Sequence, residues 1–315
     1  MRRIAFFLIL IILICVGIPS VFVLKSGVYR KPQPEDLAML KVYIKDEDKV
    51  VEMSKGQYLR EVVSAEMPAS FESEALKAQA VAARSYLTAR MNAYATGGKP
   101  QEHKGADICT DFAHCKAWIS EEKRKELWGT DADKNWAKIS AAVSDTAEQV
   151  IYFGDEVISA VFHSTSSGRT ENSKDVWGGE RAYLVSVESP GEENAPNFKS
   201  EKTLSLDEFK RIASENIEGA DLESEIIGEI TRSQAGGIIS LNIGGQAVKG
   251  TLFRTMYDLK STNVNITVTD SDVHFDVTGY GHGVGMSQYG ANAMARRGAD
   301  YIEILTHYYQ GTQVR

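Results

Sequence analysis

Residues 58–92 read YLREVVSAEMPASFESEALKAQAVAARSYLTARMN, and this stretch decides the helical part of the fold. Leu59, Val62 and Val63 recur at the spacing of one helical face, which predicts a helix whose apolar stripe faces the core. Pro68 interrupts the pattern and an alanine-rich run follows it. We therefore expect the first helix to end near Pro68 and a second helix to cover residues 73–92.

Glu66 extends the apolar stripe of the first helix by one further turn. A carboxyl group in apolar surroundings is desolvated, which disfavours its charged form and raises its pKa. A glutamic acid that stays protonated near neutral pH can donate its proton to a leaving group, so Glu66 is the candidate catalytic residue. The alternative is that Glu66 lies at the helix end and simply turns to water. Glu61 points to another face and is expected to be solvated.

Lys77, Gln79 and Arg84 are polar residues embedded in the alanine-rich helix, and we predict that they bind substrate. The planar guanidinium fork of Arg84 matches a carboxylate or the acyl group of a sugar. The alternative for Arg84 is a salt bridge to Glu66 or Glu74.

Outward from this stretch, helical and β-rich patterns are partly segregated, which predicts an α+β fold with a helical cleft region packed on β-rich segments. The other expected elements are a hairpin over 40–45 and 50–53, helices over 121–128 and 134–146, a hairpin over 149–153 and 157–162, a helix over 206–217, strands within 225–277, and helices over 286–297 and 302–309.

The chain has 315 residues, 43% of them hydrophobic, and a net charge of −8. These values are typical of a globular protein, and the acidic balance argues against an electrostatic nucleic-acid binder. Three cysteines are too few for a disulfide-dense scaffold.

An uncharged run from Ile4 to Leu24 predicts a single N-terminal transmembrane helix, since it would span about 31 Å. A cleaved signal peptide is the alternative, but the run is long and lacks a convincing A-x-A site. Arg2 and Arg3 favour a cytoplasmic start, which places the rest of the chain outside. We thus expect an anchor over 1–24, a tether over 25–36, and one extracytoplasmic region over 37–315, in which 201–275 is β-rich.

His103, Cys109, His114 and Cys115 lie within 13 residues and have the ligand types of a tetrahedral zinc site. We expect zinc here, held chiefly by His103, Cys109 and Cys115, because His114 is adjacent to Cys115. Two cysteines and two histidines would form a closed, structural site. A Cys109–Cys115 disulfide is the alternative, since the region faces outward.

Two polar segments in the second half of the chain are candidates for carbohydrate binding. His163, Ser164 and Thr165 leave a strand for a hydroxyl-rich loop, which Trp177 and Tyr183 follow. We expect the three polar residues and Tyr183 to bind substrate, with burial in the core as the alternative for both aromatic residues.

Glycine recurs at 279, 281, 283 and 285, around His282 and shortly before Gln288. The spacing does not match a dinucleotide-binding loop, and we expect no nucleotide. The glycines instead predict close approach of the backbone to a ligand, with His282 and Gln288 in the cleft.

Five blocks together are similar to the stage II sporulation protein D family: residues 58–86 of the stretch quoted first, VFHSTSSGRTENSKDVWGG (161–179), YLVSVESP (183–190), GTLFRTMYDLKST (250–262) and GYGHGVGMSQYGANAMARRG (279–298). The resemblance implies a membrane-anchored lytic transglycosylase that cleaves peptidoglycan strands during engulfment of the forespore. It would face the intermembrane space from the mother-cell membrane. It would prefer strands whose stem peptides were removed by stage II sporulation protein P, and would work alongside stage II sporulation protein M.

The resemblance also assigns the essential glutamate of the family to Glu66 and a motif arginine to Arg84, while the His–Cys cluster occurs in only part of the family. Glu66 would protonate the MurNAc–GlcNAc bond and then deprotonate the muramyl 6-hydroxyl, which gives a 1,6-anhydro product and needs no second carboxylate. Two other functions stay open. One is a non-catalytic amidase enhancer that binds glycan, and the other is a zinc-dependent cell-wall hydrolase.

Overall fold

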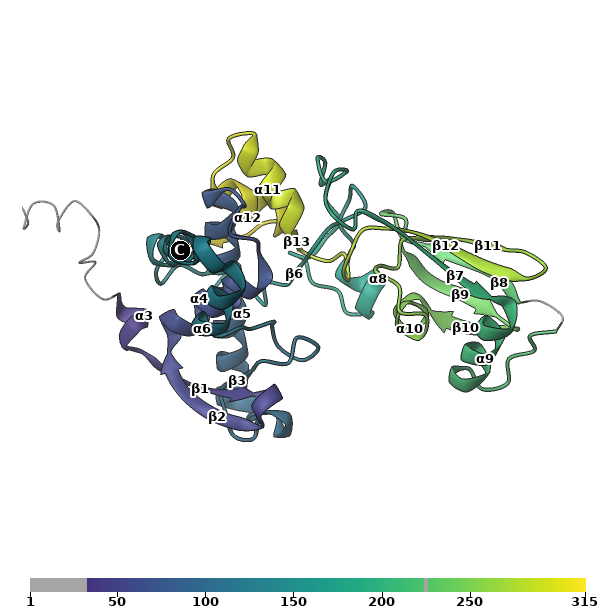
Figure 1. Cartoon of the computed structure of the whole chain (residues 1–315), viewed down its shortest axis with the longest axis horizontal. Helices are drawn as coiled ribbons and strands as arrows, with labels where there is room; N and C mark the ends of the chain where they lie inside the picture. Colours follow the sequence, from purple (N-terminus) through teal and green to yellow (C-terminus); the bar gives the residue numbers. More distant parts are fainter. Residues whose placement is uncertain (1–32, 224–225) are drawn as a thin grey trace, which may run out of the picture.

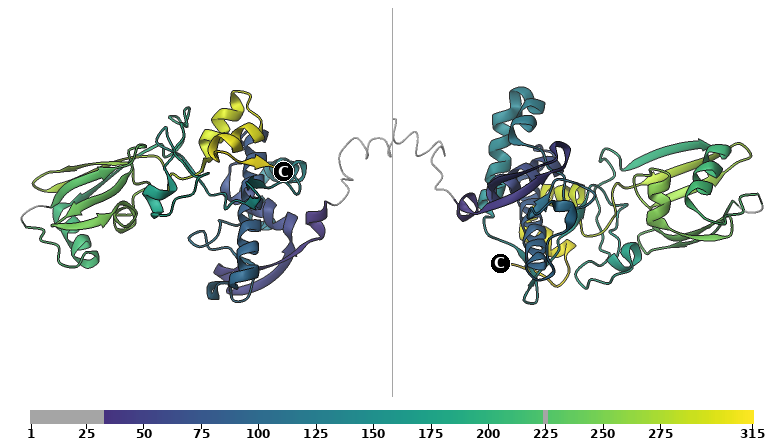
Figure 2. Two further views of the ribbon diagram at one scale, coloured as in Figure 1. Left: turned by 180° about the vertical axis from the view of Figure 1, so that it is seen from behind. Right: turned by 90° about the horizontal axis from the view of Figure 1, so that it is seen from below.

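The computed structural model describes residues 33–223 and 226–315, which form two lobes with separate hydrophobic cores (Figure 1). The helical lobe comprises residues 33–163 and 284–315, and the β lobe comprises residues 199–278. Two connecting segments, 164–198 and 279–283, join the lobes. Figure 2 shows from two further directions that most helices gather in one lobe and most strands in the other. Helices and strands are partly segregated, so the α+β prediction is confirmed.

The helical lobe begins with a short helix and a hairpin. Helix α3 (Pro34–Leu37) precedes strand β1 (Met39–Ile44), which pairs antiparallel with β2 (Lys49–Ser54) as predicted. The short 3₁₀ helix η2 (Lys45–Glu47) makes the turn between them. Strand β3 (Ile108–Cys109) adds to β1 in parallel.

Helices α4 (Lys55–Glu66) and α5 (Ser73–Gly97) follow the hairpin. The Ser54 side chain accepts a hydrogen bond from the Gln57 amide and so caps the start of α4. Met67 is extended because Pro68 follows it, and this ends α4 where the sequence predicted. Helix α5 is the centre of the lobe. Its buried alanines let α4, α7, α11 and α12 pack directly against it.

The other elements of the helical lobe surround α5. They are η3 (Gln101–His103), α6 (Glu121–Trp128), η4 (Gly129–Asp131), α7 (Ala132–Asp145), β4 (Ile151–Phe153), β5 (Glu156–Val157), α11 (Gln288–Arg296), α12 (Tyr301–Tyr308) and β14 (Gln313–Val314). The predicted helices are confirmed to within a few residues. The predicted hairpin is confirmed as a pairing of β4 with β5, but its second strand ends at Val157 and does not extend to residue 162 as predicted. Strand β14 pairs with β4, so the last strand lies in the helical lobe.

The glycine-rich connecting segment packs against the chain itself, which corrects the ligand-approach interpretation. Strand β13 (Met286–Ser287) runs parallel to β6 (Phe162–His163). Gly281 has a φ of 119°, and a Cβ there would lie 2.7 Å from the Cβ of His163. A Cβ at Gly285 would lie 2.2 Å from the Val161 carbonyl oxygen. The glycines are needed because residues 281–285 pass in close contact with residues 161–163. The short helix α8 (Ser173–Trp177) lies within the other segment.

The β lobe contains two three-stranded antiparallel sheets in the orders β10-β9-β8 and β11-β12-β7. Its elements are β7 (Lys199–Ser205), α9 (Leu206–Asn216), β8 (Ile227–Arg232), β9 (Ile238–Ile243), β10 (Gln246–Lys249), α10 (Gly250–Met256), β11 (Val264–Val268) and β12 (Asp272–Thr278). The core contains the aromatic rings of Phe209, Phe253, Tyr257 and Phe275, of which Phe209 and Tyr257 are stacked and Phe253 meets Tyr257 and Phe275 edge-on. The sequence did not predict α10, because a helix of seven residues is too short for its periodicity to stand out.

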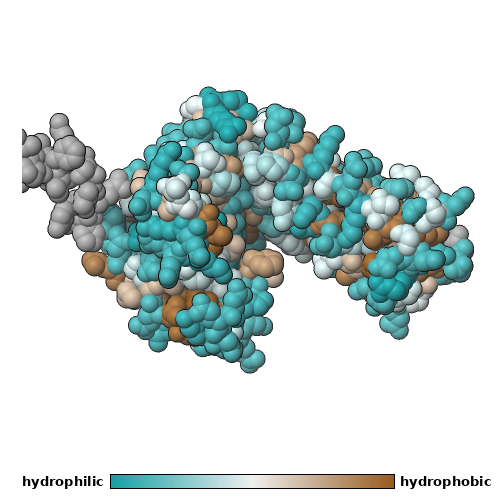
Figure 3. All heavy atoms as spheres, viewed as in Figure 1, coloured by the Kyte–Doolittle hydropathy of each residue, from teal (hydrophilic) through white to brown (hydrophobic). Residues whose placement is uncertain are grey.

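A space-filling view shows a mainly hydrophilic surface and a deep indentation between the lobes on the face shown (Figure 3). Every helix in the part of the chain that the structure describes is too short or too polar to span a bilayer. The predicted membrane anchor and most of the tether lie outside the described residues.

Candidate active site

A cleft of about 840 Å³ opens in the helical lobe where the end of α4 meets α6, α7 and the start of α11. Residues that line it include Glu66, Arg124, Trp128, Lys138, Ser164 and Gln288. Three of these, Glu66, Ser164 and Gln288, were predicted site residues. They come from distant parts of the sequence, so the cleft exists only in the folded chain.

Glu66 is the last residue of α4, and its carboxyl group is partly buried at the cleft. Burial raises its pKa above the usual range, while nearby Lys116 and two hydrogen bonds oppose this effect. One carboxyl oxygen accepts a hydrogen bond from the Ala117 amide at 3.1 Å, and the other accepts one from Gln288 Nε2 at 3.2 Å. Glu66 therefore has the raised pKa expected of a proton donor, in a position open to a ligand.

Gln288 is held in place by a second amide side chain. Gln79, fully buried on α5, accepts a hydrogen bond from Gln288 Nε2 at 3.4 Å. The Ser287 hydroxyl caps α11 by accepting from the Gly290 amide. Gln288 thus contacts Glu66 directly, whereas Gln79 supports it from behind and does not line the cleft.

Lys116 is a residue near the site that the sequence analysis missed. Its ammonium group lies 3.8 Å from the ring centre of Phe162 and 4.3 Å from that of Tyr86. Burial lowers its pKa to about 8, while Glu66 opposes this effect. Aromatic faces stabilise such a desolvated cation. Lys116 gave no periodic or motif pattern, because its environment depends on rings from α5 and β6.

Glu61 lies five residues before Glu66 on α4 and is buried, so the prediction that it is solvated is wrong. Its carboxylate accepts hydrogen bonds from Trp118 Nε1 at 2.8 Å, the Glu121 amide at 3.1 Å and Gln57 Nε2 at 3.2 Å. The segment before α6 folds over this face of α4 and covers it. Glu61 therefore holds that segment on α4 and does not face the cleft.

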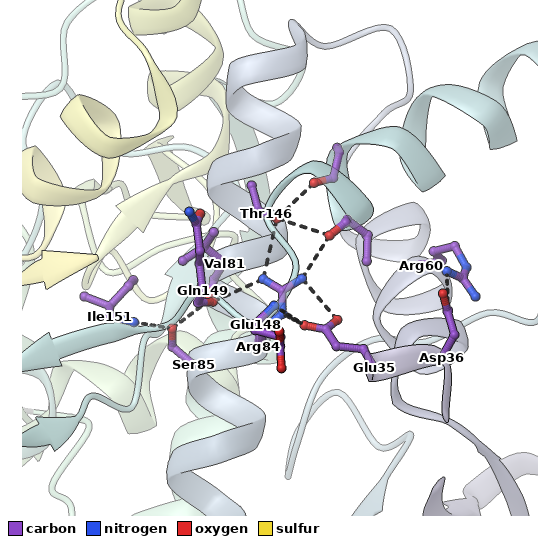
Figure 4. Close-up of polar contacts among 12 residues, drawn as sticks. Glu35, Asp36, Arg60, Val81, Arg84, Ser85, Thr146, Glu148, Gln149 and Ile151 are labelled. Carbon is purple, nitrogen blue, oxygen red and sulfur yellow. Dashed lines mark hydrogen bonds and ion pairs between the residues drawn. The ribbon is translucent and has the colours of Figure 1, made fainter. Parts of the chain in front are cut away.

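Arg84 is fully buried and lies away from the cleft, which corrects its predicted role as a substrate contact. Figure 4 shows its guanidinium group paired with the carboxylate of Glu35. The same group donates to the carbonyl oxygens of Val143 at 3.1 Å and Gln149 at 3.2 Å. The alternative prediction, a salt bridge of Arg84, is confirmed, but the carboxylate partner is Glu35 on α3 and not Glu66 or Glu74.

Lys77 and Tyr183 also lie outside the cleft. The Lys77 ammonium pairs with Glu74 at 2.7 Å and lies over the Tyr301 ring. Tyr183 packs from the connecting segment against the core of the helical lobe, with 5.7 Å between its ring centre and that of Phe153. Their positions do not support the predicted contact with a ligand in this cleft.

His163, Thr165 and His282 lie together where the two connecting segments meet. His163 is buried, its Nδ1 donates to the Val284 carbonyl at 3.2 Å, and burial lowers its pKa to about 4. Thr165 forms a β-bridge with Tyr280. The ring of His282 lies 5.1 Å from that of Trp177, which is 50% exposed. These predicted residues are near one another but outside the cleft that holds Glu66.

The His–Cys cluster has a geometry that fits zinc. His114 Nδ1 lies 3.2 Å from His103 Nε2, 3.4 Å from Cys109 Sγ and 3.5 Å from Cys115 Sγ, and all four ligand atoms lie within 4.8 Å of one another. The edges of a tetrahedral zinc site with these ligands measure roughly 3.3–3.8 Å. His114 is thus as well placed as the other three residues. Cys109 and Cys115 are free thiols, so the alternative disulfide is not formed.

Comparison with known proteins identifies the family. A family described as stage II sporulation protein matches residues 43–153. Stage II sporulation protein D of Bacillus subtilis (strain 168) is 34% identical over 297 residues, covering 92% of this chain and 84% of the relative. This chain belongs to the stage II sporulation protein D family. The stage II sporulation protein D of Bacillus amyloliquefaciens is also 34% identical, over 87% of this chain and 77% of the relative.

A more distant relative has a different name. A protein of Bacillus subtilis (strain 168) named amidase enhancer is 26% identical over 305 residues, covering 81% of this chain and 40% of that protein. Within this member of the stage II sporulation protein D family, the matched segment 43–153 contains Glu66, Arg84 and the His–Cys cluster. Gln288 and Ser164 lie beyond that segment, so the cleft combines the matched segment with later parts of the chain.

Proposed function

We propose that this protein is a lytic transglycosylase that cleaves the MurNAc–GlcNAc bonds of peptidoglycan strands stripped of stem peptides, during forespore engulfment. The observation that carries the proposal is Glu66, a carboxyl group with a raised pKa at the edge of a cleft large enough for sugar rings. Membership of a sporulation protein family supports the proposal that this cleavage takes place during sporulation.

Glu66 would act first as an acid and then as a base. Its proton passes to the glycosidic oxygen, and the GlcNAc leaving group departs from C1 of the muramyl ring. The carboxylate then takes the proton of the muramyl 6-hydroxyl as that oxygen bonds to C1, which closes the 1,6-anhydro ring and restores the acid. Water does not enter this reaction, so a second carboxylate is not required.

Asp131 also lines the cleft, and this supports hydrolysis as a second candidate reaction. An inverting hydrolase needs a carboxylate base that activates water on the far side of the sugar. The two reactions differ in their products, because hydrolysis leaves a reducing muramic acid and transglycosylation leaves an anhydro sugar lighter by one water.

The relative named amidase enhancer supports one further candidate role, and the His–Cys cluster raises another. A non-catalytic amidase enhancer would need the cleft for glycan binding but not the proton of Glu66. A zinc-dependent hydrolase would need an open position on the metal, whereas the four side chains of the His–Cys cluster would fill all four positions of a tetrahedral site. We propose that zinc is structural here: it would cross-link residues 103–115, directly before the Ala117 amide that binds Glu66.

We further propose that the chain is a single-pass protein of the mother-cell membrane, with its bulk in the intermembrane space. Stage II sporulation proteins P and M would be its partners, the first by supplying stripped strands. The uncharged run Ile4–Leu24 supports the anchor.

The test uses purified full-length protein in detergent with glycan strands stripped of stem peptides. Mass spectrometry of released fragments should find anhydro-muramyl ends with wild type and none with a folded Glu66→Gln variant. Reducing muramyl ends that disappear with Asp131→Asn would instead establish hydrolysis. Strand binding without any cleavage by wild type would favour the enhancer.

A further inference from the structure

One wall of the cleft carries three cationic side chains that the proposed reaction does not use. Arg124 is on α6, and Lys134 and Lys138 are on α7, and all three line the cleft. The neighbouring acids Glu121 and Asp133 pair with Lys125, and among the described residues none of the three cations has an ion pair within 4 Å. Lys138 donates a hydrogen bond to the carbonyl oxygen of Phe71. The Arg124 Nε atom is buried and has no hydrogen-bond partner in the described part of the chain. A buried, unpaired donor of this kind indicates a missing acceptor.

The charge of this wall is opposite to that of the protein. The chain has a net charge of −8, yet among the residues that the structure describes Asp131 is the only acidic one that lines the cleft besides Glu66. With Glu66 protonated for catalysis, the cations outnumber the acids in the cleft. The wall therefore attracts an anion into the place where the glycan would lie.

An aromatic ring lies beside the cations. The Arg124 guanidinium is 5.5 Å from the ring centre of Trp128, and Trp128 also lines the cleft. Such a ring can pack against the apolar face of a sugar while the neighbouring guanidinium binds a planar carboxylate through two parallel hydrogen bonds. Ring and cations together fit a sugar that carries an acid.

We propose that Arg124, Lys134 and Lys138 form a subsite for the lactyl carboxylate of a muramyl residue. Through this subsite the cleft would bind strands without stem peptides more tightly than strands that retain them. This inference rests on the proposed function. In stripped strands the lactyl group ends in a free carboxylate, whereas in strands that retain stem peptides it ends in a neutral amide. Lysines supply charge and the arginine supplies the geometry that matches the carboxylate.

The test measures binding, so that it does not depend on cleavage. Full-length Glu66→Gln protein is titrated with stripped strands freed of phosphate-linked polymer, and with the same strands after conversion of their carboxylates to methylamides. We expect roughly tenfold tighter binding to the carboxylate strands. Arg124→Gln, Lys138→Gln and Lys134→Gln, each made in that background, should reduce this preference. Lys134 is exposed, so its variant keeps the test valid if the Arg124 variant misfolds.

Lys123→Gln is the matched control, because Lys123 is exposed on α6 and does not line the cleft. It should retain the preference. Equal binding of both strands, or a preference that survives all three substitutions, would overturn the subsite. Tighter binding only when phosphate-linked polymer is retained would assign the wall to phosphate and also overturn it. Failure of the proposed function would differ, since wild type would then release no fragments while the binding preference remained.

Discussion

The cleft at Glu66 and the interior around Arg84 both place charged groups in apolar surroundings, yet they differ in how fully those groups are paired. Arg84 has the carboxylate of Glu35 and two backbone carbonyls as partners and is closed to solvent. Glu66 has two hydrogen bonds, one to each oxygen, and an open cleft beside it. A fully paired ion holds elements together, whereas a partly paired acid at a cavity can exchange its proton.

Glu61 shows the same difference within one helix. Burial raises the pKa of both Glu61 and Glu66. Three donors surround the Glu61 carboxylate, and it lines no part of the cleft. A raised pKa alone therefore does not distinguish a catalytic acid from a structural one, and access to a ligand does.

Glu66→Gln is expected to have the largest effect on strand cleavage, and it tests the claim that Glu66 is the catalytic acid. Without the acid, the rate of strand cleavage should fall by roughly 10²–10⁴-fold, measured as fragments released from stripped strands. The folded-state pKa of Glu66 is raised, so its contribution to stability is full below the unfolded pKa and is lost as pH rises through the folded pKa. The variant should thus gain thermal stability relative to wild type at neutral pH. Cleavage at the wild-type rate would refute the role of Glu66.

Arg84→Met tests the claim that the buried ion pair between Arg84 and Glu35 stabilises the fold. It leaves Glu35 buried and unpaired, so the free energy of unfolding measured in urea should fall by about 3–5 kcal/mol. Cleavage per folded molecule should change little. The double variant with Glu35→Leu should recover part of the loss because it removes the unpaired charge. A large loss of activity with stability intact would place Arg84 in the site after all.

Metal removal tests whether the cleft depends on the His–Cys cluster. We expect one zinc per chain by elemental analysis, and a lower melting temperature after chelation or in Cys109→Ser. Each kcal/mol lost should lower the melting temperature by roughly 2–4 °C in a domain of this size. Cys109→Ser with an unchanged melting temperature and no bound metal in wild type would rule out the structural zinc.

Gln288→Leu should have the smallest effect and sharpens the contrast between the two glutamates. Gln288 donates to Glu66 and lowers its pKa, so its loss should raise that pKa further. The basic limb of kcat/KM against pH should therefore move to higher pH. Gln57→Leu is the matched control, because it removes the same kind of donor from Glu61. If the basic limb moved in both variants, or in neither, this would contradict the claim that Glu66 is the catalytic acid and Glu61 is structural.

Much of the secondary structure could be predicted because it depends on neighbours in the chain. The end of α4 at Pro68 and the bounds of α6 follow from local periodicity and breakers. Strand β7 was not predicted as a separate strand, although most of it lies in the region 201–275 that was predicted to be β-rich, and helix α10 was missed within an expected run of strands. Short elements give weak patterns, and their state is decided by the core that they join.

The sequence alone determined that α4 would present an apolar face and that its last turn would carry Glu66 on that face, because a helix of 3.6 residues per turn places these side chains by spacing alone. Which ionisable groups remain accessible to a ligand depends on the tertiary structure. The partner of Glu66 is 222 residues away at Gln288, and that of Arg84 is 49 residues away at Glu35. Pairing and solvent access depend on such long-range packing, and local spacing carries no information about it.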